Sequence, residues 1–298
     1  MKKRDTFSTL HPSVEMLYFV WVLFITMFMM HPIVLATSLI SAMVYAIYLK
    51  GAKAVKLQLF GVLPLMIITA VMNPLFNHAG VTTLFYLSNG NPITLEAVLY
   101  GVAASGMFGS VIVWFSCYNH IMTSDKFIYL FGRIIPALSL LLSMALRFVP
   151  KFSHQIKEVS KAQESIGRSV KDGNIMKRLI AGVRVLSITI TWALENAVVT
   201  ADSMKSRGYG LKGRTAYSLY KFDKRDKMVL LIFVIAALIF AASIISGKIY
   251  VRYYPSIRMN AEGALSILGY LAFLLFCNLP MILNIMEDIT WRRLESKI

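Results

Sequence analysis

The chain has 298 residues, of which 57% are hydrophobic and only 15% are charged, and its mean hydropathy is +0.64. Soluble domains have about 25% charged and 45–50% apolar residues, so this composition excludes an ordinary soluble globule and favours an integral membrane protein. The formal charge of +16 does not indicate nucleic acid binding, because a basic excess in a membrane protein marks cytoplasmic loops and contact with anionic lipid.

Apolar runs of the length needed to cross a bilayer predict six membrane spans. A spanning helix needs about 20 mainly apolar residues. The predicted spans are, in chain order, Val14 to Met30, Ile33 to Leu49, Leu57 to Phe76, Ile93 to Cys117, Met228 to Ser246 and Gly263 to Met286. The sequence before the first run is polar and is not followed by a signal-peptide cleavage pattern, so we expect the first run to remain as a permanent span.

The distribution of basic residues predicts that both termini are cytoplasmic. Cytoplasmic loops of membrane proteins are enriched in Lys and Arg. Basic residues precede the first span at 2–4 and follow the second at 50–56, whereas 73–92 contains neither Lys nor Arg, as expected for an external loop. The external loop between the last two spans is the exception to this pattern, and its basic residues are Lys248, Arg252 and Arg258.

Most of the positive charge lies in a cytoplasmic region predicted at 121–226, between two membrane regions at 1–120 and 227–298. From Arg147 to Lys227 there are 17 Lys or Arg and 7 Asp or Glu, an excess of ten positive charges. The first membrane region holds four predicted spans and the second holds two. The predicted fold class is therefore all-α, a polytopic helical membrane protein with about six spans.

The cytoplasmic region is predicted to contain two long amphipathic helices. Arg133 and Pro136 interrupt the apolar stretch that begins it, and the uninterrupted part, Ala137–Leu146, is expected to be a buried or interfacial helix because it is too short to span a bilayer. An apolar stripe with near-heptad spacing then runs to Ile166. Pro150 must either begin this first amphipathic helix or kink it, because proline removes a backbone hydrogen bond.

The second amphipathic helix is predicted from about Arg178 to Arg207, with Gly208 and Gly210 as a C-terminal stop. Its apolar section, Leu179–Trp192, is also compatible with a version of the topology that has two further spans, so six and eight spans both remain open. Both versions leave Arg207 in the cytoplasm, because two added spans cross the membrane once outward and once back.

The sequence contains no motif for catalysis, for a cofactor or for a metal. There is no G-x-x-x-x-G-K-[ST] phosphate loop, no H-E-x-x-H and no G-x-S-x-G, and the five histidines are scattered without ligand spacing. Cys117 and Cys277 lie singly in apolar runs, so we expect buried free thiols rather than a metal pair or a disulfide. We therefore expect no enzymatic activity, no cofactor and no nucleic acid partner.

The end of the second amphipathic helix is the most informative segment. It reads Ala-Asp-Ser-Met-Lys-Ser-Arg-Gly-Tyr-Gly from Ala201 to Gly210 and presents a guanidinium at a helix tip. Such a group can form a bidentate pair with a carboxylate, or bind carbonyl groups of a partner. The alternative, which composition alone favours, is that Arg207 complements the negative end of the helix dipole.

Several segments together resemble one known family, the T components of energy-coupling factor transporters. The similar segments are Ser143–Pro150, Lys161–Gln163, Ser206–Gly210, Asn73–Phe76 with His78 and Gly80, and Ile93–Glu96. The resemblance covers nearly the whole chain. It implies a complex of this membrane scaffold with two cytoplasmic ABC-type ATPase subunits and a small membrane-embedded S component, which captures a vitamin or a metal ion.

The resemblance also implies how the scaffold works. Two long coupling helices, each ending in an Ala-Arg-Gly type motif, insert into grooves on the ATPases and transmit their ATP-driven motion to the S component. The second motif falls at Ser206, Arg207 and Gly208, with Ser in place of Ala. The first falls at Ser165-Ile166-Gly167, where arginine is missing and Arg168 is close enough to substitute in part.

Two other classes of function are the alternatives to a transporter scaffold. A secondary transporter or channel that works alone would need polar residues at mid-depth and preferably an internal repeat, and neither is found in the sequence. A membrane enzyme or assembly factor that acts on anionic lipids would need a catalytic constellation, and none is found. The transported substrate is not predictable from this chain, because the S component would select it.

Overall fold

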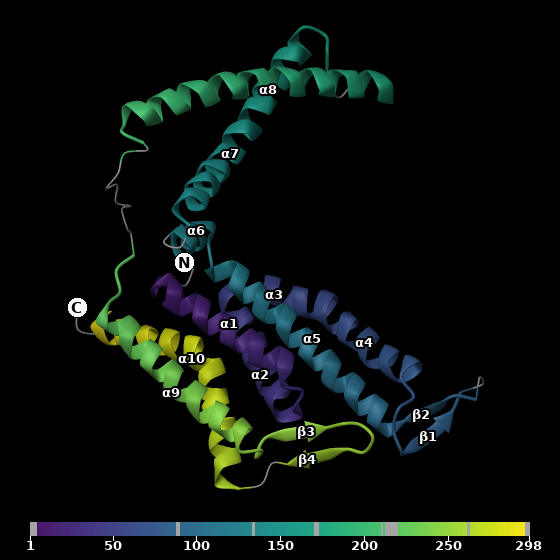
Figure 1. Cartoon of the computed structure of the whole chain (residues 1–298). Helices are drawn as coiled ribbons and strands as arrows, with labels where there is room; N and C mark the ends of the chain where they lie inside the picture. Colours follow the sequence, from purple (N-terminus) through teal and green to yellow (C-terminus); the bar gives the residue numbers. More distant parts are fainter. Residues whose placement is uncertain are drawn as a thin grey trace. The chain divides into compact units, whose positions relative to one another are not determined.

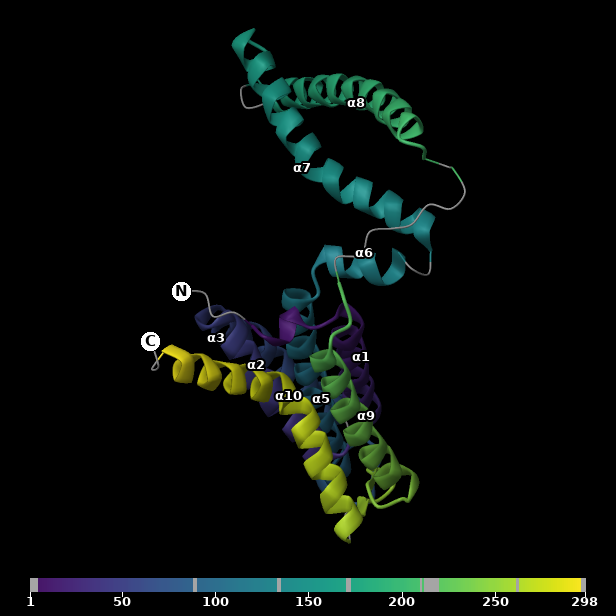
Figure 2. The same cartoon turned by 90° about the vertical axis from the view of Figure 1, so that its left-hand side faces the viewer.

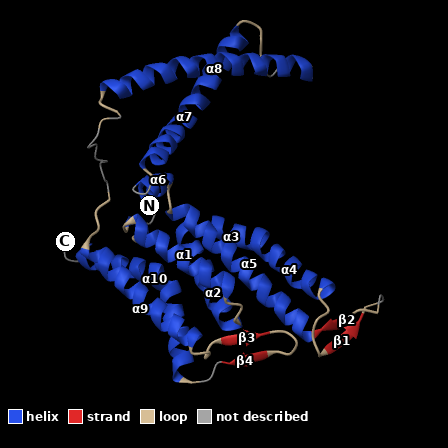
Figure 3. Ribbon diagram, in the orientation of Figure 1, coloured by secondary structure: helices blue, strands red, loops and turns tan. Residues whose placement is uncertain are grey.

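The computed structural model describes residues 5–87, 90–132, 135–169, 173–209, 211, 220–260 and 263–295. The chain forms two compact units, the first comprising Met1–Lys126 with Tyr220–Ile298 and the second Phe127–Leu219. The described residues are mostly helical, with two small β-hairpins (Figures 1 and 3), so the all-α fold class is confirmed. The predicted division at residues 121 and 226 concerns the sides of the membrane and stays a prediction.

The described part of the first unit contains seven complete α-helices. It also contains the start of α6 (Ser124–Gly132), and the boundary to the second unit falls within that helix. These helices are α1 (Pro12–Phe28), α2 (Pro32–Lys50), α3 (Ala52–Leu57), α4 (Leu63–Phe76), α5 (Leu95–Ile121), α9 (Lys224–Ile245) and α10 (Ala264–Glu295). A π-helical turn, Gln58–Val62, joins α3 to α4, so that 52–76 is one helical segment.

Two antiparallel hairpins and a 3-10 turn also belong to the first unit. They are β1 (Thr83–Tyr86) with β2 (Pro92–Thr94), β3 (Tyr250–Arg252) with β4 (Arg258–Asn260), and η1 (Phe7–Thr9). The fourth span was expected to begin at Ile93, but its helix begins at Leu95. Thr94 caps the helix through its hydroxyl, which accepts from the Ala97 amide at 3.3 Å, while the residues before it pair with β1.

Six helical segments of the described chain are long and apolar enough to cross a membrane. Five correspond to predicted spans and comprise α2, the segment 52–76, α5, α9 and α10. The sixth is α8 (Ile175–Ser206), predicted as an amphipathic helix, whereas the predicted first span is α1, which is apolar but has only 17 residues. Composition therefore supports a multi-pass membrane protein, and does not decide between six and eight spans.

The last helix is longer than the predicted span. It was expected to end at Met286, but α10 continues to Glu295 and includes Trp291 to Arg293. Its 32 residues correspond to about 48 Å, more than the roughly 30 Å of a bilayer core. Pro280 interrupts its hydrogen bonding, and the Tyr18 hydroxyl donates to the nearby Cys277 carbonyl oxygen at 3.0 Å.

Aromatic side chains form the core of the first unit. Tyr18 is fully buried and packs against Phe233 and Phe276 with ring centroids 5.2 Å from each. Trp114 is also buried and donates from Nε1 to the Ser38 hydroxyl at 3.0 Å. These contacts join α1, α2, α5, α9 and α10, so the two predicted membrane regions form one packed bundle.

Loops gather at the two ends of this bundle (Figures 1 and 2). At the connector end, where the chain leaves for the second unit, the His11 amide donates to Asp226 at 3.1 Å. At the hairpin end, which comprises Met29–His31 and both β-hairpins, the Tyr253 hydroxyl donates to the Met30 carbonyl oxygen at 2.8 Å. The two ends lie at opposite termini of α1 and of α9.

The second unit consists mainly of α7 (Pro136–Ser165) and α8. The sequence predicted the amphipathic stretch as the continuation of Ala137–Leu146, with Pro150 either beginning a new helix or lying within one. One continuous helix of 30 residues covers both parts. Pro150 lies inside α7 and does not begin it. Pro150 has no amide to donate to the Leu146 carbonyl oxygen, and its ring crowds that carbonyl, so this turn of α7 lacks one hydrogen bond.

Candidate functional site

The candidate site consists of the C-terminal ends of α7 and α8. At the end of α7, Gly167 has a φ of 75° and donates its amide to the Glu164 carbonyl oxygen at 3.0 Å. The Arg168 amide donates to the Gln163 carbonyl oxygen at 2.9 Å. These two bonds define a Schellman motif, in which a glycine in the left-handed region satisfies the last carbonyls of a helix.

The end of α8 has the same motif. Gly208 has a φ of 78° and donates its amide to the Lys205 carbonyl oxygen at 2.9 Å, and the Tyr209 amide donates to the Met204 carbonyl oxygen at 3.0 Å. The predicted stop at Gly208 is therefore confirmed, and its companion Gly210 lies outside the described residues. A side chain other than glycine would be strained at both positions.

Capping geometry aligns the two helix ends residue by residue. Ser165 corresponds to Ser206 as the last helical residue, Ile166 to Arg207 as the C-cap, and Gly167 to Gly208. Both serine hydroxyls donate to carbonyl oxygens of their own helix, Ser165 to Lys161 at 3.1 Å and Ser206 to Ser203 at 2.9 Å. The two ends thus share a backbone and differ in chemistry at the C-cap.

The side chains at these C-caps are available for a partner. Arg207 is exposed, and its guanidinium has no acceptor within the part of the chain that the structure describes. Ile166 is 60% exposed and places an aliphatic group at the equivalent position. Arg168 is also exposed and follows Gly167. It lies two residues beyond the C-cap of α7, whereas Arg207 is itself the C-cap of α8.

Side chains near the middle of both helices fix how α7 and α8 cross. Phe152 packs edge-on against Trp192, with ring centroids 6.0 Å apart. Lys151 Nζ lies 5.0 Å from the centre of the same indole and 3.1 Å from the Asn196 side-chain oxygen, to which it donates. This crossing therefore combines aromatic packing, a cation–π contact and a hydrogen bond.

The apolar faces of α7 and α8 are largely uncovered within this chain. On the predicted stripe of α7, Val159 is buried, but Val149 is 64% exposed. On the predicted face of α8, Leu194 and Val198 are 64% and 63% exposed. Exposed apolar surface of this extent marks contact with a protein or with lipid.

The structure brings the predicted site residues together in two groups. It places Ser165, Ile166, Gly167 and Arg168 at one helix end and Ser206, Arg207 and Gly208 at the other. The sequence did not reveal the crossing at Trp192, although an aromatic residue within a basic amphipathic helix is a usable signal. The coupling role of the seven residues stays a prediction.

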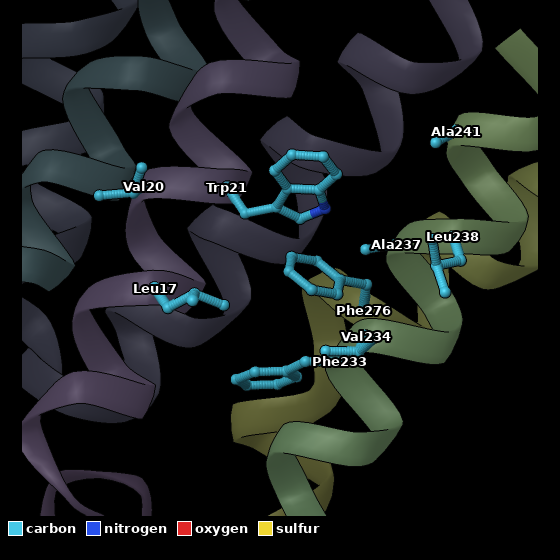
Figure 4. Close-up of a pocket in the computed structure, with 9 residues that line it drawn as sticks. All are labelled: Leu17, Val20, Trp21, Phe233, Val234, Ala237, Leu238, Ala241 and Phe276. Atoms are coloured by element: carbon cyan, nitrogen blue, oxygen red, sulfur yellow. The ribbon is translucent and has the colours of Figure 1, made fainter. Parts of the chain in front are cut away.

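An apolar cavity of about 370 Å³ lies elsewhere, in the first unit (Figure 4). It is lined by Leu17, Val20 and Trp21 of α1, by Phe233, Val234, Ala237, Leu238 and Ala241 of α9, and by Phe276 of α10. These side chains are aliphatic or aromatic, and the one polar group among them, the indole N–H of Trp21, is buried without a hydrogen-bond partner in the described part of the chain. A ligand site normally also has a few polar groups that orient the ligand, so this cavity is not a candidate binding site.

Comparison with protein families shows which family the chain belongs to. The model of a family described as "CbiQ: Cobalt transport protein" matches residues 5–217. The chain belongs to the CbiQ family. The matched region covers η1 and the helices from α1 to α8, and so includes both ends of the candidate site.

Relatives of this CbiQ family member carry the name energy-coupling factor transporter transmembrane protein EcfT. The protein from Bacillus selenitireducens is 33% identical over 112 residues, which are 37% of this chain and 40% of the relative. The protein from Macrococcus caseolyticus is 28% identical over 238 residues, 74% of this chain and 88% of the relative. The first of these matches thus spans about two fifths of the relative. The names confirm the resemblance to energy-coupling factor T components.

Proposed function

We propose that this CbiQ family member is the transmembrane scaffold of an energy-coupling factor transporter. It transmits the ATP-driven motion of two cytoplasmic ATPase subunits to a membrane-embedded S component, which binds the vitamin or metal ion. The observation that carries the proposal is the pair of identically capped, exposed helix ends on two crossing helices.

The capped ends suit insertion into grooves on two similar subunits. The Schellman motif satisfies the last carbonyls internally, so a helix tip can enter a groove without leaving backbone groups unpaired. The same cap on both helices fits a pair of similar ATPases. Arg207 supplies a donor fork for a carboxylate or carbonyl groups, and Ile166 supplies an apolar contact.

The uncovered faces of α7 and α8 suit the second partner. An apolar helix face exposed in the cytoplasmic region is stabilised when a partner or the membrane surface removes it from water. Apolar residues along α7 and α8 would therefore lie against the S component or the lipid. The crossing at Trp192 holds the two helices together, so a displacement of one tip is transmitted to the other helix.

Co-purification tests the proposed function. We expect the tagged full-length chain, extracted from its host in mild detergent, to retain two proteins with phosphate loops and one small membrane protein. The complex should hydrolyse ATP, and the chain stripped of partners should not, because its sequence has no phosphate loop. Uptake of a substrate into vesicles by the chain alone would contradict the scaffold role and favour a stand-alone transporter.

The proposed orientation places both termini, Lys161, Arg168 and Arg207 in the cytoplasm of a cell-membrane protein. We expect single cysteines at these three positions to react with an impermeant maleimide only in inverted vesicles. The native Cys117 and Cys277 are buried, at 0% and 1% exposure, and should give little background. A cysteine at Lys248 is the matched control and should react only from the outside. Labelling of position 161 or 168 in intact cells would favour eight spans.

A further inference from the structure

The β3–β4 hairpin carries the basic residues that oppose the predicted topology. It is held firmly at the hairpin end of the first unit. Tyr100 contacts Tyr253 and Tyr254 with ring centroids 5.5 and 5.4 Å apart, and the Asn77 side chain donates to the Tyr254 hydroxyl at 2.9 Å. The side chains on this hairpin therefore extend from an ordered support.

The register of the hairpin separates two faces. Val251 pairs with Met259, and Val251 packs against the buried cluster that contains Tyr253. The opposite face contains two cross-strand pairs, Tyr250 with Asn260 and Arg252 with Arg258. All four side chains of this second face are exposed.

The second face places two arginines directly opposite each other. Like charges at opposed positions of an antiparallel pair are destabilising. Arg252 Nε donates to the Tyr254 carbonyl oxygen at 2.7 Å, which directs its guanidinium, and the Arg258 side chain has no partner among the described residues. Two adjacent guanidinium groups are stabilised when an anion with several acceptor oxygens bridges them.

Few acidic residues lie near these arginines in the sequence. Residues 243–260 contain Lys248, Arg252 and Arg258 and no Asp or Glu, and the next acidic residue, Glu262, lies outside the described residues. Glu96 at the same end is buried, and its carboxylate accepts from the Thr82 amide and hydroxyl at 3.2 and 2.9 Å. Among the described residues, the hairpin therefore presents a positive face without an acidic side chain on it.

The surroundings of the arginines match the boundary between lipid headgroups and acyl chains. Tyr250, on the same face as the arginines, is 51% exposed, and Ile245 at the end of α9 is 85% exposed. Tyrosine is typical of the membrane interface, where its ring is apolar and its hydroxyl is hydrated. Exposed apolar groups on the same hairpin as two exposed arginines fit a phospholipid, which provides both chemistries.

We propose that Arg252 and Arg258 together bind the phosphate of an anionic phospholipid in the leaflet at the hairpin end. With the orientation proposed above, this is the outer leaflet. Tyr250 and Ile245 contact the upper acyl chains, and Lys248 adds charge nearby. This site accounts for the basic external loop, and it does not depend on the coupling role of Arg207.

Photo-cross-linking in nanodiscs tests the site. The full-length chain is placed in phosphatidylcholine discs with a small fraction of phosphatidylglycerol that carries a diazirine near its headgroup. We expect the probe to label the peptide of residues 247–260. Replacing both Arg252→Gln and Arg258→Gln should lower this labelling about 25-fold, because each basic residue near the membrane contributes roughly a fivefold preference for anionic lipid.

Two further variants control the measurement. The double variant Lys53→Gln and Lys56→Gln removes two exposed charges at the connector end and should leave labelling of the hairpin unchanged. The double variant Arg252→Lys and Arg258→Lys keeps the charge and should retain a larger part of the labelling, which excludes simple unfolding of the hairpin.

Three results would overturn the proposal. One is equal labelling of the hairpin by the phosphatidylglycerol probe and by a matched phosphatidylcholine probe. Another is displacement of the probe by millimolar inorganic phosphate, which would indicate a site for a free anion. The third is unchanged labelling in the arginine-to-glutamine double variant, which would leave the face open to an acidic protein partner.

Discussion

Arg207→Glu is expected to abolish retention of the ATPase subunits and transport. The substitution replaces an exposed donor fork by a group that accepts hydrogen bonds and repels acidic acceptors in the partner. A charge-assisted hydrogen bond contributes about 1.5–3 kcal/mol, so loss of the contact alone lowers affinity by roughly 10- to 150-fold. The measurement is a pull-down of the ATPase pair, normalised to membrane expression, together with an uptake assay.

The aligned helix ends provide controls for this experiment. Arg168→Glu should cause a smaller loss, because Arg168 lies beyond Gly167 and not at the C-cap. Ile166→Arg places an arginine at the C-cap of α7 and should be tolerated, or should strengthen assembly if the groove keeps its acceptors. If the Arg207→Glu variant assembles and transports like the parent, Arg207 serves the helix dipole instead and the coupling motif is misplaced.

Lys126→Met is expected to destabilise the first unit by about 3–5 kcal/mol, because it leaves a buried carboxylate without its counter-charge. Lys126 Nζ contacts both carboxylate oxygens of Glu15 at 2.7 and 2.8 Å and donates to the Ser8 carbonyl oxygen at 2.6 Å. The side chains are only 8% and 0% exposed. Lys126 is the last residue of the first unit before the chain enters the second unit, and this ion pair connects it to α1.

Thermal unfolding in detergent measures this effect. A thiol-reactive fluorogenic dye reports exposure of Cys117 and Cys277, which are buried in the first unit. The midpoint should fall by roughly 10 °C, at about 2–4 °C for each kcal/mol. Adding Glu15→Gln to Lys126→Met should recover part of the loss, because the uncompensated charge is then absent.

The exposed ion pair between Lys161 and Glu158 provides the matched control. Its atoms are 3.2 Å apart, and its side chains are 72% and 50% exposed. Lys161→Met should change the midpoint little, since an exposed pair on one helix contributes about 0.3–0.5 kcal/mol. Equal effects of Lys126→Met and Lys161→Met would show that the Glu15 pair is not the anchor we infer.

The sequence alone predicted the features that depend on local chemistry and on the thickness of the bilayer. Spans were predictable because about 20 apolar residues are needed to cross the hydrocarbon core, and five of the six coincide with helices of that length. The end of α8 was predictable because glycine adopts positive φ without strain. The family was predictable because its motifs are short and contiguous.

Only the tertiary structure decided the features that join distant parts of the chain. The pairing of Glu15 with Lys126 connects residues 111 positions apart. Glu15 is the one charged residue of the predicted first span, but the sequence does not show which side chain pairs with it. The shared cap geometry of the two helix ends required the backbone hydrogen bonds of both, and the opposed arginines required the strand register. Hydropathy indicates which segments are apolar enough to lie in lipid. Helix packing and strand register determine which side chains from distant parts of the chain are in contact.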